Sequence, residues 1–272
     1  MNALPIYLNL FKEFNLKATF FLVGKDLEND SNVKLLKKIL DDGHEVANHG
    51  YLHNGFDTFS NKEKFDDIRK SHDIIKLKLN TECHGFKAPC YALDVSVIKM
   101  LMKIGYEYDS SMISTVISGM MKMYYRFIVR QKMHPSNWGY FSHLFAPSAP
   151  YHPDQRYIWR KGKEDILEMP VTTLPFLKIP IHFSFINVIG FKLFFFYKLF
   201  TYISPTSFLN YSFHAVDLLP HNVLPKSFYY RPGLKRTLQW RLDRAKWILE
   251  EIMKRYTIQT SFSISQKYRK LL

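Results

Sequence analysis

Cysteine is scarce in this sequence, and its scarcity excludes two classes of small protein. Cys83 and Cys90 are the only two cysteines among 272 residues. Two thiols are too few for a disulfide scaffold, and nothing around them has zinc-finger spacing. A reducing compartment fits this pattern, although the pattern does not require one.

A targeting segment is also missing from the start of the sequence. Residues 1–5 (MNALP) lack the basic start, the long apolar run and the cleavage site of a secretory signal. We therefore expect a cytoplasmic location, either in solution or peripheral at the membrane. The sequence also lacks internal repeats and flexible linkers, so residues 1–272 are predicted to form a single domain.

Acidic residues are few relative to basic ones. There are 24 Asp and Glu against 38 Lys and Arg, so the net charge is +14. This balance favours anionic partners such as phospholipid head groups, phosphorylated substrates or nucleic acid. The basic residues are dispersed and no DNA- or RNA-binding motif is present. A membrane surface is therefore the expected partner, and nucleic acid is not expected.

The hydrophobic pattern that is present alternates between helical and strand periodicity, which is typical of an α/β fold. Helices are predicted at 4–15, 31–43, 60–79, 94–105 and 235–255. Strands are predicted at 17–24, 44–48, 85–89, 107–109, 166–172, 211–218 and 257–262. The stretch 111–160 reads as an irregular insertion of one helix and loops. Residues that could act in catalysis or metal binding lie at the carboxyl ends of the predicted strands, which is where α/β barrels have their active sites.

Local signals predict where several helices begin and end. Ser31 can cap the second helix, which Gly43 would terminate in a left-handed conformation. The stretch from Ser60 to Glu63 is a capping box for the third helix. Asp94 can cap the fourth helix, which would stop at Gly105.

A histidine pair follows the second predicted strand. His49 and His53 lie four residues apart within HEVANHGYLH, residues 44–53. Two imidazoles at this spacing can converge on one metal ion. They form an incomplete ligand set, because a catalytic zinc site usually has three protein ligands and an open position for water.

Five motifs occur in one order along the chain. They are KATFFLVG (17–24), HEVANHGYLH (44–53), GFKAPCY (85–91), YDSSM (108–112) and FHAVDL (213–218). In this order and spacing the sequence resembles the polysaccharide deacetylases, the NodB-homology or carbohydrate esterase 4 group. The similarity covers about residues 4–110 and 165–260. It implies a distorted (β/α) TIM-like barrel that removes acetyl groups from N-acetylated sugars with one divalent metal, most often zinc.

The resemblance implies a role for each matching residue. His49 and His53 would bind the metal, and His214 would be the general acid. Asp109 stands in the motif that orients the acid histidine, and Lys87 stands where the family usually has Arg, the partner of the base. The expected substrate-binding residues are Pro89, Tyr91 and Asp217, with a backbone N–H near Tyr91 completing the oxyanion site.

These roles suit the chemistry of amide hydrolysis. A metal acts as a Lewis acid and lowers the pKa of its bound water to roughly 7. A histidine, with an ordinary pKa near 6.5, can carry a proton at neutral pH and deliver it to the leaving amine.

Each role also has a structural alternative. His214 could be a satisfied buried histidine, Asp109 a helix or turn cap, and Asp217 a structural contact. Lys87 could be a solvated cation, and the two metal candidates could be ordinary loop histidines.

The sequence departs from the family pattern in several places. The family's first motif, an Asp-Asp pair on the first strand, is absent, so the third metal ligand and the base are expected upstream of Met1. The strand at 17–24 would then lack one neighbour. Either the chain is truncated or it is a degenerate, inactive relative. Gly50 replaces a usual Ser or Thr, Lys87 cannot form the bidentate contacts of Arg, and Cys90 replaces a usual Gly.

One apolar segment, residues 183–203 (FSFINVIGFKLFFFYKLFTYI), is as long as a membrane span. Lys192 and Lys198 argue against a lipid-exposed span and are compatible with an amphipathic helix that lies at the membrane interface. A buried barrel helix and a true span are the alternatives.

The sequence therefore predicts a metal-dependent hydrolase that removes N-acetyl groups from a cell-envelope polysaccharide or a lipid-linked saccharide, impaired in this chain. Two alternatives remain open. One is a non-catalytic carbohydrate- or lipid-binding relative with the same fold. The other is a deformylase that acts on a lipid-linked aminosugar.

Overall fold

A parallel sheet of five strands forms the centre of the protein. The computed structural model describes residues 1–56, 59–117, 140–175, 178–189, 207–224 and 232–270, with Phe195, Lys198, Leu199 and Tyr202 as isolated positions. The strands are β1 (Thr19–Leu22), β2 (Glu45–Asn48), β3 (Gly85–Phe86), β4 (Tyr108–Asp109) and β5 (Leu167–Glu168). Their spatial order is β1-β2-β3-β4-β5, and every neighbouring pair is parallel. Such a singly wound order is the arrangement of a β/α barrel, as predicted.

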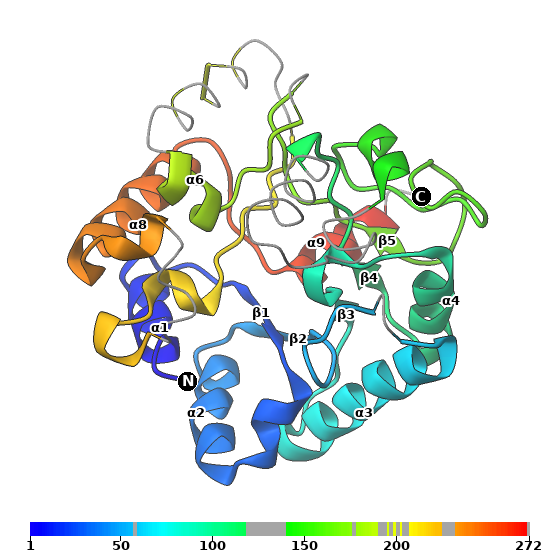
Figure 1. The fold of residues 1–272 in the computed structure, drawn as a ribbon, viewed down its shortest axis with the longest axis horizontal. Helices are drawn as coiled ribbons and strands as arrows, with labels where there is room; N and C mark the ends of the chain where they lie inside the picture. The colour runs from blue at the N-terminus through cyan, green and yellow to red at the C-terminus, as the bar shows by residue number, and fades with distance from the viewer. Residues whose placement is uncertain are drawn as a thin grey trace, which may run out of the picture.

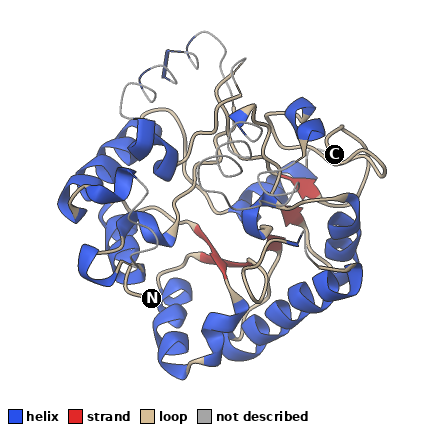
Figure 2. Cartoon of the chain, in the orientation of Figure 1, coloured by secondary structure: helices blue, strands red, loops and turns tan. Residues whose placement is uncertain are grey.

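Helices surround this sheet (Figure 1). The described helices are α1 (Leu4–Glu13), α2 (Asp30–Asp41), α3 (Asn61–Leu79), α4 (Val95–Ile104), α6 (Phe183–Ile189), α8 (Leu238–Met253) and α9 (Ser261–Arg269). Short 3₁₀ turns lie between them: η1 (Gly24–Glu28), η3 (Pro89–Tyr91), η4 (Phe141–Phe145), η5 (Ala215–Leu218), η6 (His221–Val223) and η8 (Pro232–Lys235). Figure 2 shows how little strand there is relative to helix and loop, because several strands are only two residues long.

Two of the predicted helix termini are confirmed by their hydrogen bonds. Ser60 Oγ accepts a bond from the Glu63 amide at 3.3 Å, and the Glu63 carboxylate accepts one from the Ser60 amide at 2.7 Å. Asp94 Oδ1 accepts a bond from the Val97 amide at 3.0 Å. Gly105 has φ +100° and ends α4 in the left-handed region.

The predicted cap of α2 is wrong by two residues. Asn29, not Ser31, is the N-cap, and its Oδ1 accepts bonds from the Ser31 amide at 2.9 Å and the Ser31 hydroxyl at 2.6 Å. An Asn side chain can form this turn as readily as a Ser.

Two predicted strands are absent from the described structure. Residues 211–214 pair with no strand, and the following residues form η5. Residues 257–260 are irregular, and α9 begins at Ser261, capped by Thr260 Oγ1. In both places aromatic or β-branched residues favour strands locally, but neither segment pairs with a strand among the described residues.

The predicted insertion at 111–160 is irregular where it is described. Residues 118–139 lie outside the described residues, so the predicted helix there is not tested. The remainder contains η4 and isolated bridges, including an antiparallel bridge between Tyr151 and Glu168.

The core has two main parts, and Phe20 of β1 packs against both. One packs α2, α3 and α4 against the sheet and includes Ile39, Ile68, Phe86 and Leu101. The other packs α1, α6 and α8 together and includes Leu10, Phe183, Leu218 and Ile248. The second part holds the loop before η5 in place, which is where His214 lies.

The described residues of the apolar segment 183–203 lie in two kinds of environment. Phe183 and Ile186 in α6 are buried in the core, as the buried-helix alternative predicts. In contrast, Phe195, Leu199 and Tyr202 are 66%, 46% and 75% exposed. Most other residues of its second half lie outside the described residues. Among the described helices, none has the length and apolar character needed to cross a membrane.

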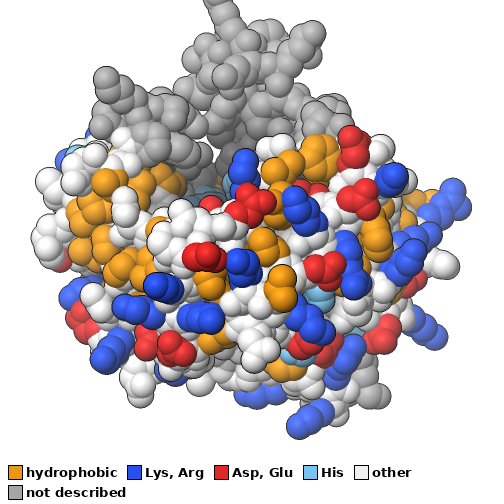
Figure 3. Space-filling view, turned by 90° about the horizontal axis from the view of Figure 1, so that it is seen from below, with side chains coloured by type: hydrophobic (Ala, Val, Ile, Leu, Met, Phe, Trp, Pro, Cys, Tyr) orange, Lys and Arg blue, Asp and Glu red, His pale blue; other side chains and the backbone are white. Residues whose placement is uncertain are grey.

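Charged side chains of both signs are mixed on the surface. Figure 3 shows, from below, Lys and Arg spread over that face with Asp and Glu among them. On this face, basic and acidic side chains are therefore interspersed.

Candidate active site

The histidine pair lies at the carboxyl end of β2. The His49 amide donates to the Leu22 carbonyl at 2.8 Å, which continues the pairing with β1. His49 is half-buried and His53 is exposed. Their ring centroids are 4.8 Å apart with an interplanar angle of 65°. The chain thus brings the two predicted metal ligands together.

Helix α3 supports the loop between the two histidines. The Asp67 carboxylate accepts bonds from the Tyr51 amide at 2.8 Å and the Leu52 amide at 3.0 Å. The Ser71 hydroxyl donates to the Gly50 carbonyl at 3.0 Å. Sequence reasoning missed both side chains, because nothing in the sequence shows which face of α3 meets this loop.

Gly50 has a conformational reason to be glycine. Its φ is +75°, and a Cβ there would lie 2.8 Å from Asp67 Oδ1. Gly50 replaces a usual Ser or Thr, whose hydroxyl could support the loop. Asp67 and Ser71 supply that support instead.

A backbone carbonyl orients His49. Its Nδ1 lies 2.6 Å from the Lys87 carbonyl oxygen. Since a carbonyl can only accept, Nδ1 carries the hydrogen and Nε2 keeps a lone pair for a ligand. Burial, and then the neighbouring His53, lower the pKa of His49 to about 3. The pKa of His53 is also lowered, first by desolvation and then by His214. Both rings are therefore neutral, the form that binds metals.

His214 lies at the same end of the sheet. A charge on His214 would lower the pKa of both His49 and His53, so the three rings share one electrostatic environment. Ser184 Oγ lies 2.8 Å from His214 Nδ1 and donates to Asp217 Oδ1 at 2.6 Å. Because that hydroxyl gives its single proton to Asp217, it accepts one from His214 Nδ1, which leaves Nε2 of His214 for proton transfer.

Asp217 and Arg241 fix the turn that carries His214. The Asp217 carboxylate accepts a bond from the His214 amide at 2.7 Å. Burial works to raise the pKa of Asp217, but hydrogen bonds from His214 and Ser184 outweigh it and keep the pKa below its ordinary value. The buried Arg241 donates to the carbonyl of Asp217 at 2.6 Å and to that of Leu219 at 2.9 Å. The carboxylate beside His214 is therefore ionised and firmly held.

Asp109 contacts a different set of groups from the one expected. Its carboxylate accepts bonds from the Ser111 hydroxyl at 2.7 Å and the Ser111 amide at 3.0 Å. The described hydrogen bonds of His214 join it to Tyr7, Ser184 and Asp217, and none joins it to Asp109. The carboxylate described beside His214 is that of Asp217, and the role of Asp109 stays a prediction.

Lys87 is buried, so the alternative of a solvated cation is wrong. Its Nζ donates to the Ser110 carbonyl at 2.5 Å and lies 3.1 Å from the Ser110 hydroxyl. Burial lowers the pKa of Lys87 to about 8, although the Asp109 and Glu168 carboxyls act to raise it.

The loop after β3 has an unusual backbone. Cys90 and Tyr91 both have positive φ, 55° and 58°. Pro89 and Tyr91 are buried, and Cys90 is exposed. The Tyr91 ring lies beneath Lys87 Nζ, 5.7 Å from its centroid, and burial raises the pKa of its phenol. The predicted substrate-binding residues Pro89 and Tyr91 thus lie beside the groups that hold His49.

His49 and His53 are suitable as two of the ligands of a divalent metal. Two neutral imidazoles, one oriented by a carbonyl, are suitable donors for zinc. Within the described ranges, no group of three or more His, Cys, Asp or Glu side chains converges to hold a metal.

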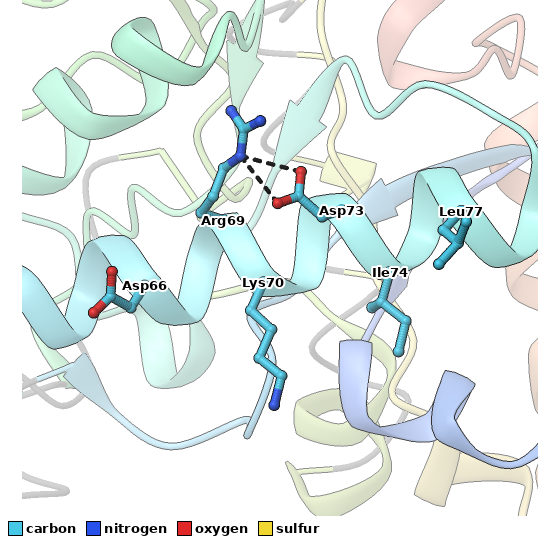
Figure 4. A pocket seen from close by; sticks show the side chains of 6 residues that line it. All are labelled: Asp66, Arg69, Lys70, Asp73, Ile74 and Leu77. Carbon is cyan, nitrogen blue, oxygen red and sulfur yellow. Dashed lines mark hydrogen bonds and ion pairs between the residues drawn. The ribbon is translucent and has the colours of Figure 1, made fainter.

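A hollow of about 470 Å³ lies elsewhere, on the outer face of α3. It is lined by Asp66, Arg69, Lys70, Asp73, Ile74 and Leu77 (Figure 4). Its lining side chains belong to one helix, and the Arg69–Asp73 pair is exposed. It does not include any of the predicted site residues.

Comparison with known proteins agrees with the motifs. Residues 2–108 match the family model of the polysaccharide deacetylases. A peptidoglycan deacetylase of Helicobacter pylori is 34% identical over 110 residues, 40% of this chain and 37% of that protein. A peptidoglycan-N-acetylglucosamine deacetylase of Bacillus cereus is 35% identical over 71 residues, 26% of this chain and 25% of that protein.

Solved structures are similar over part of the chain. A CE4 family pseudoenzyme from Bacillus anthracis has a TM-score of 0.38 at 27% identity, and covers 49% of this chain and 47% of that chain. The chain spans well under half the length of the two curated relatives above. Over residues 2–108, less than half of its length, the chain is similar to the polysaccharide deacetylase family.

Proposed function

We propose that this site removes N-acetyl groups from an amino sugar of a cell-envelope polysaccharide, with a divalent metal, zinc, bound by His49 and His53. One observation carries the proposal. The Lys87 carbonyl binds His49 Nδ1 at 2.6 Å and so directs Nε2 of a neutral ring toward a ligand, while His214 shares the same end of the sheet. The family match supports the reaction, and the names of the relatives support an envelope glycan.

The side chains divide the work of amide hydrolysis. A bound metal would stabilise the oxyanion and lower the pKa of water. His214 would donate a proton from Nε2 to the leaving amine, while Ser184 and the Asp217 carboxylate hold its Nδ1 side. The reaction also needs a third metal ligand and a general base, and we expect both to be carboxylates.

The lipid-linked substrate and the membrane contact are finer parts of this proposal. Phe195, Leu199 and Tyr202 are exposed apolar side chains at helical spacing. Flotation with anionic liposomes tests the contact. Binding should weaken when Phe195 and Tyr202 are both changed to Ser, and unchanged binding would rule the contact out.

Zinc binding and acyl release test the main proposal. In calorimetry with zinc alone, His49→Ala should weaken binding by more than about 100-fold, beyond the 10–100-fold typical of residues that only orient a ligand. His84→Ala, at the opposite end of β3, is the matched control and should bind like the wild type. If the wild-type chain binds no zinc, the proposed metal site is wrong.

The acyl product distinguishes the remaining functions. Acetate release from N-acetylglucosamine oligosaccharides, lost in His49→Ala and in His214→Ala, supports the deacetylase. Formate release from an N-formyl sugar would support the deformylase instead. Zinc binding together with sugar binding but without either product would show the non-catalytic relative.

A further inference from the structure

A second buried acid lies beside Asp109. Glu168 is its partner in the β4–β5 register, and both side chains are 0% exposed. Two ionised carboxylates cannot share a buried position without a large energetic cost. The sequence does not reveal this pair, because β4 and β5 are separated by the insertion.

The hydrogen bonds around the two carboxyls show where a proton belongs. Both oxygens of Asp109 already accept bonds from Ser111, at 2.7 and 3.0 Å. Glu168 Oε1 accepts a bond from the Met112 amide at 3.0 Å. Glu168 Oε2 is buried and receives no bond from any described donor. An O–H at Oε2 that donates to Asp109 satisfies this atom.

The charges nearby lead to the same assignment. Lys87 is the cation that faces the pair, and it acts to lower the pKa of both acids. Burial raises the pKa of Asp109, and it raises that of Glu168 well above the ordinary value. The only other titratable group described against Glu168 is Tyr151, whose phenol donates to the Ile158 carbonyl at 2.8 Å. One proton on the pair therefore balances the single charge of Lys87.

We propose that Glu168 is a positioning residue that remains protonated at neutral pH and donates its Oε2–H to the Asp109 carboxylate. The group formed by Glu168, Asp109 and Lys87 then carries one negative charge, on Asp109, and one positive charge, on Lys87. The side-chain hydrogen-bond partner described for the Glu168 carboxyl is Asp109.

This proton acts on His49 through a chain of hydrogen bonds. Asp109 accepts from the Ser111 hydroxyl, and that hydroxyl accepts from the Ala88 amide at 2.7 Å. Ala88 follows Lys87, whose carbonyl binds His49. Glu168 thus holds the end of β3 through Asp109 and Ser111. The consequence for catalysis rests on the proposed function, whereas the protonation of Glu168 does not.

Infrared spectroscopy of the full chain, without metal or substrate, tests the proton directly. The wild type at neutral pH should show the C=O band of a protonated carboxyl, and Glu168→Gln should lose it. Glu250→Gln, which changes an exposed acid, should keep the band. If the wild type lacks the band, or if Glu168→Gln retains it, the proposal is wrong, whatever the outcome for zinc and acetate.

Two substitutions at Glu168 test its positioning role. Gln can accept from Met112 and donate an N–H to Asp109, so Glu168→Gln should keep the Tm and zinc affinity of the wild type. Leu has similar volume but cannot donate, so Glu168→Leu should lower the Tm and weaken zinc binding by about 10-fold. If Glu168→Gln lowers the Tm as much as Glu168→Leu, Glu168 is not a donor and the role is excluded.

Discussion

The two ends of the sheet hold their carboxyl groups in different ways. At the amino end, Glu45 accepts bonds from Thr19 Oγ1 at 2.6 Å, Tyr108 OH at 2.5 Å and the Phe262 amide at 2.9 Å. At the carboxyl end, Asp109 and Glu168 face each other beneath Lys87. At the amino end neutral donors bond one carboxyl group, that of Glu45, whereas at the carboxyl end two buried acids lie beside Lys87 and burial displaces the pKa of all three groups. Such displacement is typical of functional sites in barrels.

Helix α9 makes the amino end a structural closure. The Phe262 ring stacks on His84 with centroids 3.9 Å apart, and Arg269 pairs with Glu107 at 3.0 Å. The remaining hollow here, about 240 Å³, is lined partly by Glu45 and Phe262. We therefore expect changes at this end to affect stability, and changes at the other end to affect ligand binding.

The largest effect should come from Glu45→Ala at the amino end. It leaves the Thr19 and Tyr108 hydroxyls and the Phe262 amide without their acceptor, so the free energy of unfolding should fall by about 3 kcal/mol. Urea denaturation measures this, and calorimetry should show unchanged zinc binding. Glu82→Ala, which breaks only an exposed pair with Lys76, is the control. A loss of zinc binding in proportion to stability would remove the distinction between the ends.

Substitutions at Gly50 and Gly105 distinguish the effect of backbone strain from the effect of losing a contact in the candidate site. Gly50→Ala should cost about 2 kcal/mol, because its positive φ disfavours a side chain and because the Cβ displaces Asp67. Gly105→Ala has the same backbone problem but no atom within 4 Å of the new Cβ, so about 1 kcal/mol is expected. Only Gly50→Ala should weaken zinc binding. Equal zinc affinities in the two variants would show that Asp67 does not position the histidine loop.

Asp217, at the carboxyl end of the sheet, should make the free energy of unfolding depend on pH. Its pKa is lower in the folded protein than the ordinary value of 3.8. The unfolded chain therefore binds more protons between these two values, so stability rises with pH there. The contribution is complete above the unfolded pKa and is lost as pH falls through the folded pKa.

The matching substitution is Asp217→Asn. It should cost about 1.5 kcal/mol near neutral pH, and the difference from wild type should shrink below pH 3.8. Urea denaturation across this pH range measures it, with the exposed Asp66→Asn as control. A difference that stays constant with pH would mean that the Asp217 charge does not stabilise the turn.

The smallest effect is expected from Arg269→Ala. Its ion pair with Glu107 is 3.0 Å long, but the Arg side chain is 41% exposed, so about 0.5 kcal/mol is expected. Thermal unfolding in low and high salt measures it. A loss of more than about 1.5 kcal/mol would show that α9 depends on this pair rather than on Glu45.

Elements set by local hydrogen bonds could be predicted from the sequence. The capping box of Ser60 and Glu63 and the αL glycine at Gly105 involve residues within one turn, and both are found. The predicted last strand fails because the start of α9 is fixed by the distant Glu45 and Thr19, which bind the amides of Phe262 and Ser261. Local preference cannot show such contacts.

The candidate site divides in the same way. The motifs identify His49 and His53, and the structure places their rings together. Ser184, Asp67 and Glu168 were not predicted, because each acts on a partner distant in sequence or reached across the sheet. The metal and acid roles themselves remain predictions.

The hydrogen bonds of Glu45 and Thr19 to α9 can form only late in protein synthesis. The amide of Phe262 is made 217 residues after Glu45, and Ser261 is made 242 residues after its acceptor Thr19. At about 5–20 residues per second, the ribosome takes roughly 10–40 s to supply the donor for Glu45. During that interval β1 and β2 can pair, but their amino ends are open. The nascent chain should therefore need protection from aggregation until α9 emerges, and should complete its fold late.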